Sequence, residues 1–159
     1  MSSANGQADW ASDEAYLADL ARFIGERTGL RAAHVKAAER AEIIYEAACY
    51  RSFGGPILYG HEHVDFEALA RKHPDIIPAE GYFTHSSYED KIVFLVRETS
   101  LSSRDAVEYL AAGMAFRRAA GISTSADEDE DSFRRWAKGW LASNKGLHLR
   151  LVKNEESER

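Results

Sequence analysis

Apolar residues recur at helical spacing through most of the chain. Between Leu17 and Ile24 they return every three or four positions, and Gly29 then supplies a helix stop, so a helix is predicted over 13–28. A longer stretch rich in alanine and glutamate predicts a second helix over 31–53, which the following Gly-Gly-Pro sequence must end. The chain therefore opens with two helices joined by a tight turn.

Capping residues mark the starts of the remaining predicted helices. Asp65 is placed to cap a short helix over 66–72. Serines followed three residues later by an acid precede two apolar runs, and this capping-box pattern predicts helices over 87–99 and 103–120. Aromatic and alanine residues at helical spacing predict a short amphipathic helix over 133–140.

Two short segments have the pattern of strands. Ile57–Tyr59 is apolar and bracketed by glycines, and leucines alternate with polar residues over 147–151. The two segments predict a two-stranded ribbon. We therefore expect a mostly α protein, a single-domain bundle of about six helices with at most one short two-stranded β ribbon.

Polar stretches divide the chain. Residues 1–11 are small and polar and predict a disordered tail ahead of a helical domain over 12–122. An acidic linker is predicted over 123–131. Residues 132–153 are expected to form a tryptophan-containing basic helix and short strand on the same domain, and 154–159 a charged tail.

One pair of segments is similar within the chain. The stretch 23–30, Phe-Ile-Gly-Glu-Arg-Thr-Gly-Leu, aligns with 94–101, Phe-Leu-Val-Arg-Glu-Thr-Ser-Leu, and each precedes an alanine-rich helix. Both stretches are typical of a helix, a tight turn and a second helix. Internal duplication explains the likeness, and so do two ordinary helical hairpins.

Composition limits the function classes. The chain has 159 residues, 45% of them apolar, and a net charge of −6, which argues against general coating of nucleic acid. Its single cysteine excludes an intrachain disulfide and fits a reducing compartment. There is no apolar run of membrane-spanning length and the first residues are unlike a signal peptide, so a cytoplasmic location without membrane contact is expected.

A helix-turn-helix is one candidate site, over 95–110. Such a unit presents the start of its second helix to the DNA major groove, which here places Ser102, Ser103 and Arg104 toward the nucleic acid. Arginine is suited to reading guanine and serine to holding phosphate. The alternative is an ordinary helical corner.

A family resemblance supports the DNA-binding hypothesis. In the segment 41–59, a predicted helix ends at Phe53. Two glycines and a proline follow it, and then the short apolar segment Ile57–Tyr59. It resembles the helix, Phe-Gly-Gly turn and short strand of Mor-type phage transcription activators, in which a helix-turn-helix follows. The resemblance implies a transcription regulator that dimerises through Phe53–Tyr59 and reads duplex DNA with the helix-turn-helix.

Histidines define a second candidate site. His61 and His63 alternate in a segment expected to be extended, which would aim both imidazoles to one side. Together with His73, His85 or Glu67 they offer ligands for zinc and hence for a metal-dependent hydrolase. The alternative is that these histidines are solvated and that the protein has no cofactor.

The third candidate site is the C-terminal basic and aromatic segment. Trp136 and Trp140 lie among Arg134, Arg135 and Lys138. Tryptophan beside arginine is typical of protein-binding surfaces, and the same mixture suits single-stranded nucleic acid. Alternatively, both tryptophans pack in the core and the cations face water.

Motifs for covalent catalysis are missing from the sequence. It contains no nucleophile elbow, phosphate loop or dinucleotide-binding glycine pattern, and Cys49 lies within a predicted helix, as a small buried residue would. The leading hypothesis is therefore a small non-enzymatic regulatory or adaptor protein that binds a protein partner through the tryptophan-containing helix.

Overall fold

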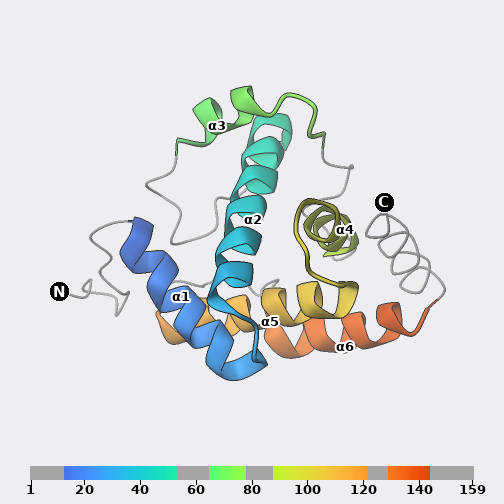
Figure 1. Ribbon diagram of the computed structural model, residues 1–159. Coiled ribbons are helices and arrows are strands. Elements are labelled where there is room, and N and C mark those ends of the chain that lie inside the picture. The colour runs from blue at the N-terminus through green and yellow to red at the C-terminus, as the bar shows by residue number, and fades with distance from the viewer. Residues whose placement is uncertain (1–12, 54–64, 78–87, 122–128, 144–159) are drawn as a thin grey trace.

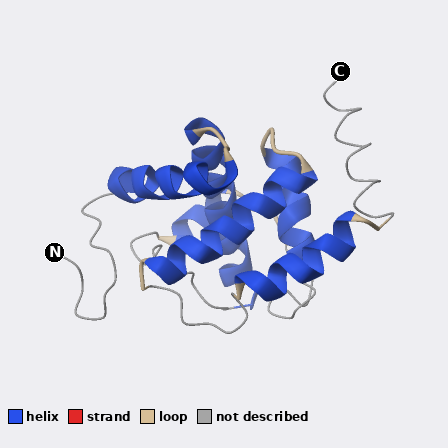
Figure 2. Ribbon diagram, turned by 90° about the horizontal axis from the view of Figure 1, so that it is seen from below, coloured by secondary structure: helices blue, strands red, loops and turns tan. Residues whose placement is uncertain are grey.

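The protein is a bundle of helices. The computed structural model describes residues 13–53, 65–77, 88–121 and 129–143, and within them every regular element is a helix (Figures 1 and 2). The elements are α1 (Asp13–Thr28), α2 (Ala32–Phe53), α3 (Phe66–Lys72), α4 (Tyr88–Glu98), α5 (Ser103–Ala119) and α6 (Glu130–Leu141). This confirms the mostly α fold, whereas the two strands predicted at 57–59 and 147–151 lie outside the described residues.

The helix boundaries follow the predicted capping residues, with one difference. Asp65 and Ser102 cap α3 and α5 with their side chains. Helix α6 begins at Glu130, inside the predicted linker over 123–131, because the Asp129 side chain caps it by accepting hydrogen bonds from the amide and hydroxyl of Ser132. The acidic run is therefore partly helical.

Two helical hairpins, α1–α2 and α4–α5, form the centre of the bundle. Helix α1 packs against α5, and α4 packs against α2, so each helix of one hairpin contacts a helix of the other. Helix α3 lies across the far end of α2, and α6 runs beside α5 (Figure 1). None of the described helices combines the length and apolar character needed to cross a lipid bilayer.

The two hairpin turns have the same pattern of hydrogen bonds. In the first turn the Thr28 hydroxyl donates to the carbonyl four residues earlier at 2.7 Å and accepts from the Leu30 amide at 3.1 Å. In the second turn the Thr99 hydroxyl donates to the carbonyl four residues earlier at 2.6 Å and accepts from the Leu101 amide at 3.1 Å. These threonines and leucines are the residues that the internal alignment matches.

The main core lies between the two hairpins and α6. The largest fully buried side chains include both apolar residues and two glutamates: Tyr109, Phe133, Leu20, Ile24, Ile92, Leu95, Leu101, Glu39, Glu42, Val35 and Val96. Cys49 is buried in α2, as its position predicted.

A smaller cluster holds α3 on the end of α2. Phe66 and Ala70 pack on Ala47. The Arg51 guanidinium donates to the carbonyls of Ala70 and Ile76, each at 3.0 Å. This arginine of α2 therefore fastens the C-terminal end of α3 and the residues that follow it.

Candidate partner-binding groove

Helix α6 presents three different faces. Its buried face carries Phe133, Ala137 and Trp140, which have the spacing of one helical stripe. Arg135 lies on the exposed face, where its guanidinium donates to the Ser132 hydroxyl at 3.2 Å. The third face, with Lys138, turns toward the start of α5.

The two tryptophans belong mainly to the interior. Trp140 is 8% exposed, and its indole N–H donates to Glu89 Oε2 on α4 at 2.6 Å. Trp136 is half-buried and stacks on Trp140, with ring centroids 5.8 Å apart, and it also contacts Tyr88. The indoles therefore anchor α6 to α4, which is the core placement that the sequence left open.

Ion pairs join α6 to its neighbours. Arg134 bonds Glu130 on its own helix at 2.9 Å and Glu108 on α5 at 3.1 Å. Glu130 also accepts from Arg27 of α1 at 3.4 Å, and Arg118 of α5 lies 3.9 Å from the α6 cap. Burial by itself would lower the pKa of Arg134, but hydrogen bonds and charges from the two glutamates outweigh it and raise that pKa. Arg134 therefore stays charged and serves mainly to join α5 and α6.

A groove of about 480 Å³ lies between the N-terminal half of α5 and the C-terminal half of α6. Its lining combines small and branched apolar side chains with three cations and one acid: Arg104, Val107, Glu108, Arg134, Ala137, Lys138, Leu141 and Ala142. This volume lies within the range of about 300–1,000 Å³ that ligand sites occupy. The groove is large enough for a few side chains of a partner.

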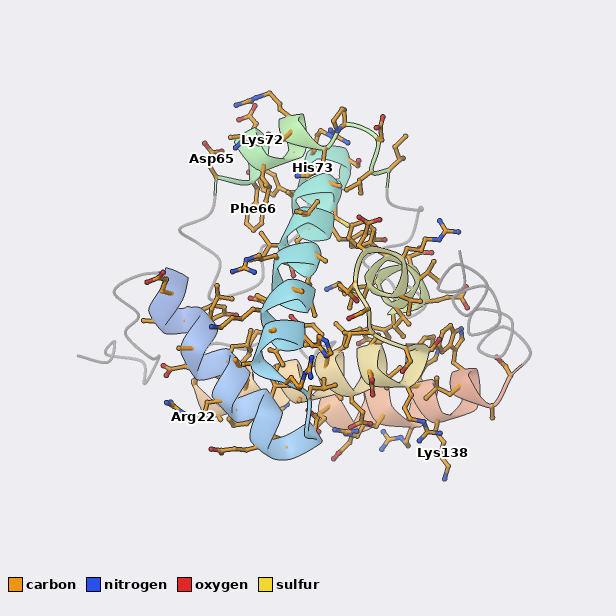
Figure 3. The ribbon with its side chains drawn as sticks, in the orientation of Figure 1. Arg22, Asp65, Phe66, Lys72, His73 and Lys138 are labelled. Carbon is orange, nitrogen blue, oxygen red and sulfur yellow. The ribbon has the colours of Figure 1, made fainter. Side chains whose placement is uncertain are left out.

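The groove carries two cations that are available to a ligand. Arg104 and Lys138 are exposed, and neither forms an ion pair within the described part of the chain. Arg134 is already paired with acids. Lys138 extends away from the bundle, on the side opposite α3 and Lys72 (Figure 3). The groove thus places, beside apolar side chains, two positive charges that have no ion-pair partner among the described residues.

The residues proposed for DNA contact are placed differently. Ser102 uses its hydroxyl to cap α5, accepting from the Asp105 amide at 3.1 Å, and Ser103 is fully buried. Helix α5 is buried on most of its surface, including Tyr109 and Leu110. Of the three proposed DNA-contact residues, Arg104 alone is exposed, and it lines the groove instead of extending a basic face.

The predicted zinc site falls mostly outside the described residues. His61, His63 and His85 lie in undescribed segments, whereas His73 ends α3 and Glu67 lies 3.5 Å from Arg71. Among the described residues, histidines, cysteines and acids form no group of three able to hold a metal ion. Zinc binding through His61 and His63 stays a prediction.

Sequence patterns revealed only part of the groove. They separated Arg104, as a DNA contact, from Lys138, as a protein contact, although the structure brings the two residues to one groove. They also missed Leu141, which lies just beyond the predicted helix over 133–140. The missing information was the pairing of α5 with α6, because spacing within a helix does not reveal which other helix its face meets.

Comparison with known proteins leaves the chain without a match among protein families, curated proteins or solved structures. The likeness of 41–59 to Mor-type activators is therefore not tested, and part of that segment, 54–59, lies outside the described residues.

Proposed function

We propose that this protein is a small non-enzymatic adaptor or regulatory protein that binds a protein partner in the groove between α5 and α6. The observation that carries the proposal is the placement of Arg104 and Lys138, which form no ion pair among the described residues, beside the accessible apolar side chains of Leu141 and Ala142. We place the protein in the cytoplasm, where a buried cysteine stays reduced.

The chemistry of the groove favours a partner segment that is both apolar and acidic. Half-buried Leu141 and exposed Ala142 offer a surface on which an apolar side chain gains by leaving water. Carboxylates flanking that side chain would pair with Arg104 and Lys138. Because exposed ion pairs contribute only about 0.2–1 kcal/mol each, the apolar contact supplies most of the affinity and the charges mainly orient the partner.

The same geometry argues against duplex DNA as the main partner. A DNA-reading helix needs an exposed face with several cations, but α5 is buried on most of its surface and Glu108 lies in the same groove as Arg104. Negative charge at this position repels phosphate. An acidic protein segment carries fewer negative charges than duplex DNA, so Glu108 repels it less than it repels a row of phosphates.

The proposal is tested by capture from the native host with tagged protein, with and without nuclease, followed by mass spectrometry. The groove variant is Arg104→Glu combined with Lys138→Glu. The matched control is Lys72→Glu combined with Arg97→Glu, which reverses two exposed cations that do not line the groove.

We expect the parent and the control to capture the same proteins equally, with or without nuclease treatment. The groove variant should fail to capture them. Equal capture by all three forms would overturn the groove as the binding site. Loss of every partner on nuclease treatment would favour nucleic acid as the bound molecule instead.

A further inference from the structure

The two hairpins contact each other through equivalent residues. The internal alignment matches Phe23 with Phe94, and the same shift matches Tyr45 with Phe116. In the structure Phe23 packs on Phe116 with ring centroids 5.5 Å apart, and Tyr45 packs on Phe94 at 5.1 Å. Each contact joins the first helix of one hairpin to the second helix of the other, so exchanging the hairpins maps one contact onto the other, as an approximate two-fold axis would.

Burial follows the same equivalence along the helices. Ile24 and Leu95, which the shift matches, are both fully buried in the first helices. In the second helices, Glu46 is matched by Arg117, and both are buried although both are charged. The two hairpins are therefore equivalent in these contacts and in this pattern of burial.

Charged residues break this symmetry. Helix α2 buries three glutamates on one face, Glu39, Glu42 and Glu46. Lys91 of α4 lies 3.0 Å from Glu42 and 3.7 Å from Glu46, and it is only 12% exposed. The Tyr109 hydroxyl of α5 contacts Glu39 at 2.6 Å and Glu42 at 2.8 Å. Tyr16 of the first hairpin also hydrogen-bonds Glu39. The first hairpin thus supplies the buried acids, and the second hairpin supplies the cation that pairs with Glu42 and Glu46.

At the equivalent place on the other side of the axis, the charges are different. The shift matches Lys91 with Leu20, and it matches Glu42 and Glu46 with Gly113 and Arg117. Two copies of the first hairpin would therefore bury glutamates against leucine, and two copies of the second would bury lysine beside arginine. A buried charge without a partner is strongly unfavourable, so both like pairings are penalised.

We infer that the contacting faces of the two hairpins form a charge-matched interaction surface. On this surface the buried charges of one hairpin pair with the opposite hairpin, and they would be left unpaired against a second copy of the same hairpin. Leu20 occupies the position that Lys91 occupies across the axis. This inference is independent of the groove between α5 and α6.

The symmetry makes a specific prediction for Leu20. Leu20→Lys is expected to place an ammonium beside Arg117 and so to lower the urea midpoint of unfolding. Combining it with Arg117→Glu recreates, across the axis, the lysine–glutamate pair of Lys91 and Glu46. We expect the double variant to unfold at a higher midpoint than the two single changes predict by addition.

An additive or lower midpoint for the double variant would overturn the inference. Should both Leu20→Lys and the double variant be unfolded, a second series decides. Lys91→Leu gives the second hairpin the residue of the first, and we expect it to lower the midpoint even though it adds an apolar side chain. Adding Glu42→Gln and Glu46→Gln should restore part of the loss.

A Lys91→Leu midpoint equal to or above that of the parent would contradict the charge-matched surface. The control is Arg71→Leu, which breaks an exposed ion pair with Glu67. That change should leave the midpoint nearly unaltered, because exposed pairs contribute little.

Discussion

Replacing Trp140 separates a core role from a partner-contact role for the α6 tryptophans. Only 8% of Trp140 is exposed, so Trp140→Ala removes almost the whole indole from the interior. Truncation of a buried tryptophan typically lowers the free energy of unfolding by about 3–5 kcal/mol. The whole free energy of unfolding of a typical domain is about 5–15 kcal/mol, so this loss is a large fraction of it.

Part of that loss comes from one hydrogen bond. The indole N–H donates to Glu89 Oε2 at 2.6 Å, and hydrogen bonds to charged groups contribute about 1.5–3 kcal/mol. Trp140→Phe keeps an aromatic ring but removes this donor, so we expect it to lose roughly 1.5–3 kcal/mol.

Urea unfolding followed by circular dichroism measures these losses. Lys138→Ala, on the exposed side of the same helix, is the control and should change the free energy of unfolding by no more than about 0.5 kcal/mol. A Trp140→Ala protein as stable as the parent but unable to bind its partner would refute the core assignment.

Three further predictions concern the other structural contacts. Arg51→Ala should lower the free energy of unfolding by about 1 kcal/mol and speed amide exchange in α3, since it removes two hydrogen bonds to carbonyls, whereas unchanged exchange would contradict the anchoring role. Thr28→Val and Thr99→Val should each lose about 0.5–1.5 kcal/mol in chemical unfolding, and clearly unequal losses would contradict the equivalence of the two turns. Burial first, and then nearby glutamates, raise the pKa of Tyr16 and of Tyr109. A raised folded-state pKa gives stability that is complete below the unfolded value of about 10 and is lost as pH rises above it, so ultraviolet titration should show these two hydroxyls ionising only as the protein unfolds.

The sequence predicted the helices because capping residues, glycine stops and apolar spacing all act within a few residues of the chain. Gly29 ends α1 at positive φ, and Ser102 caps α5, as the sequence predicted. The start of α6 was missed because Asp129 lies within an acidic run, where composition favoured a linker over a cap. The ends of helices therefore depend on single side chains that composition obscures.

The candidate site could be predicted only in part, because its residues come from two helices. Amphipathic spacing located the helix of Trp140 but could not say whether its apolar stripe meets the core or a partner, since both give the same pattern. The burial of Glu42 could not be predicted because a glutamate in a helix is usually exposed, and only its partners Lys91 and Tyr109, distant in sequence, explain it. Such contacts between distant residues need the fold.

Site-specific photocrosslinking in the native host tests the proposed groove most directly. A photoreactive amino acid placed at Ala142 lies in the groove lining, and one placed at exposed Lys72 lies on α3, on the opposite side of the bundle from Lys138 (Figure 3). The account predicts a protein crosslink from position 142, abolished by Arg104→Glu combined with Lys138→Glu, and little or none from position 72. Equal crosslinking from both positions, or a position-142 crosslink that survives charge reversal, would contradict it.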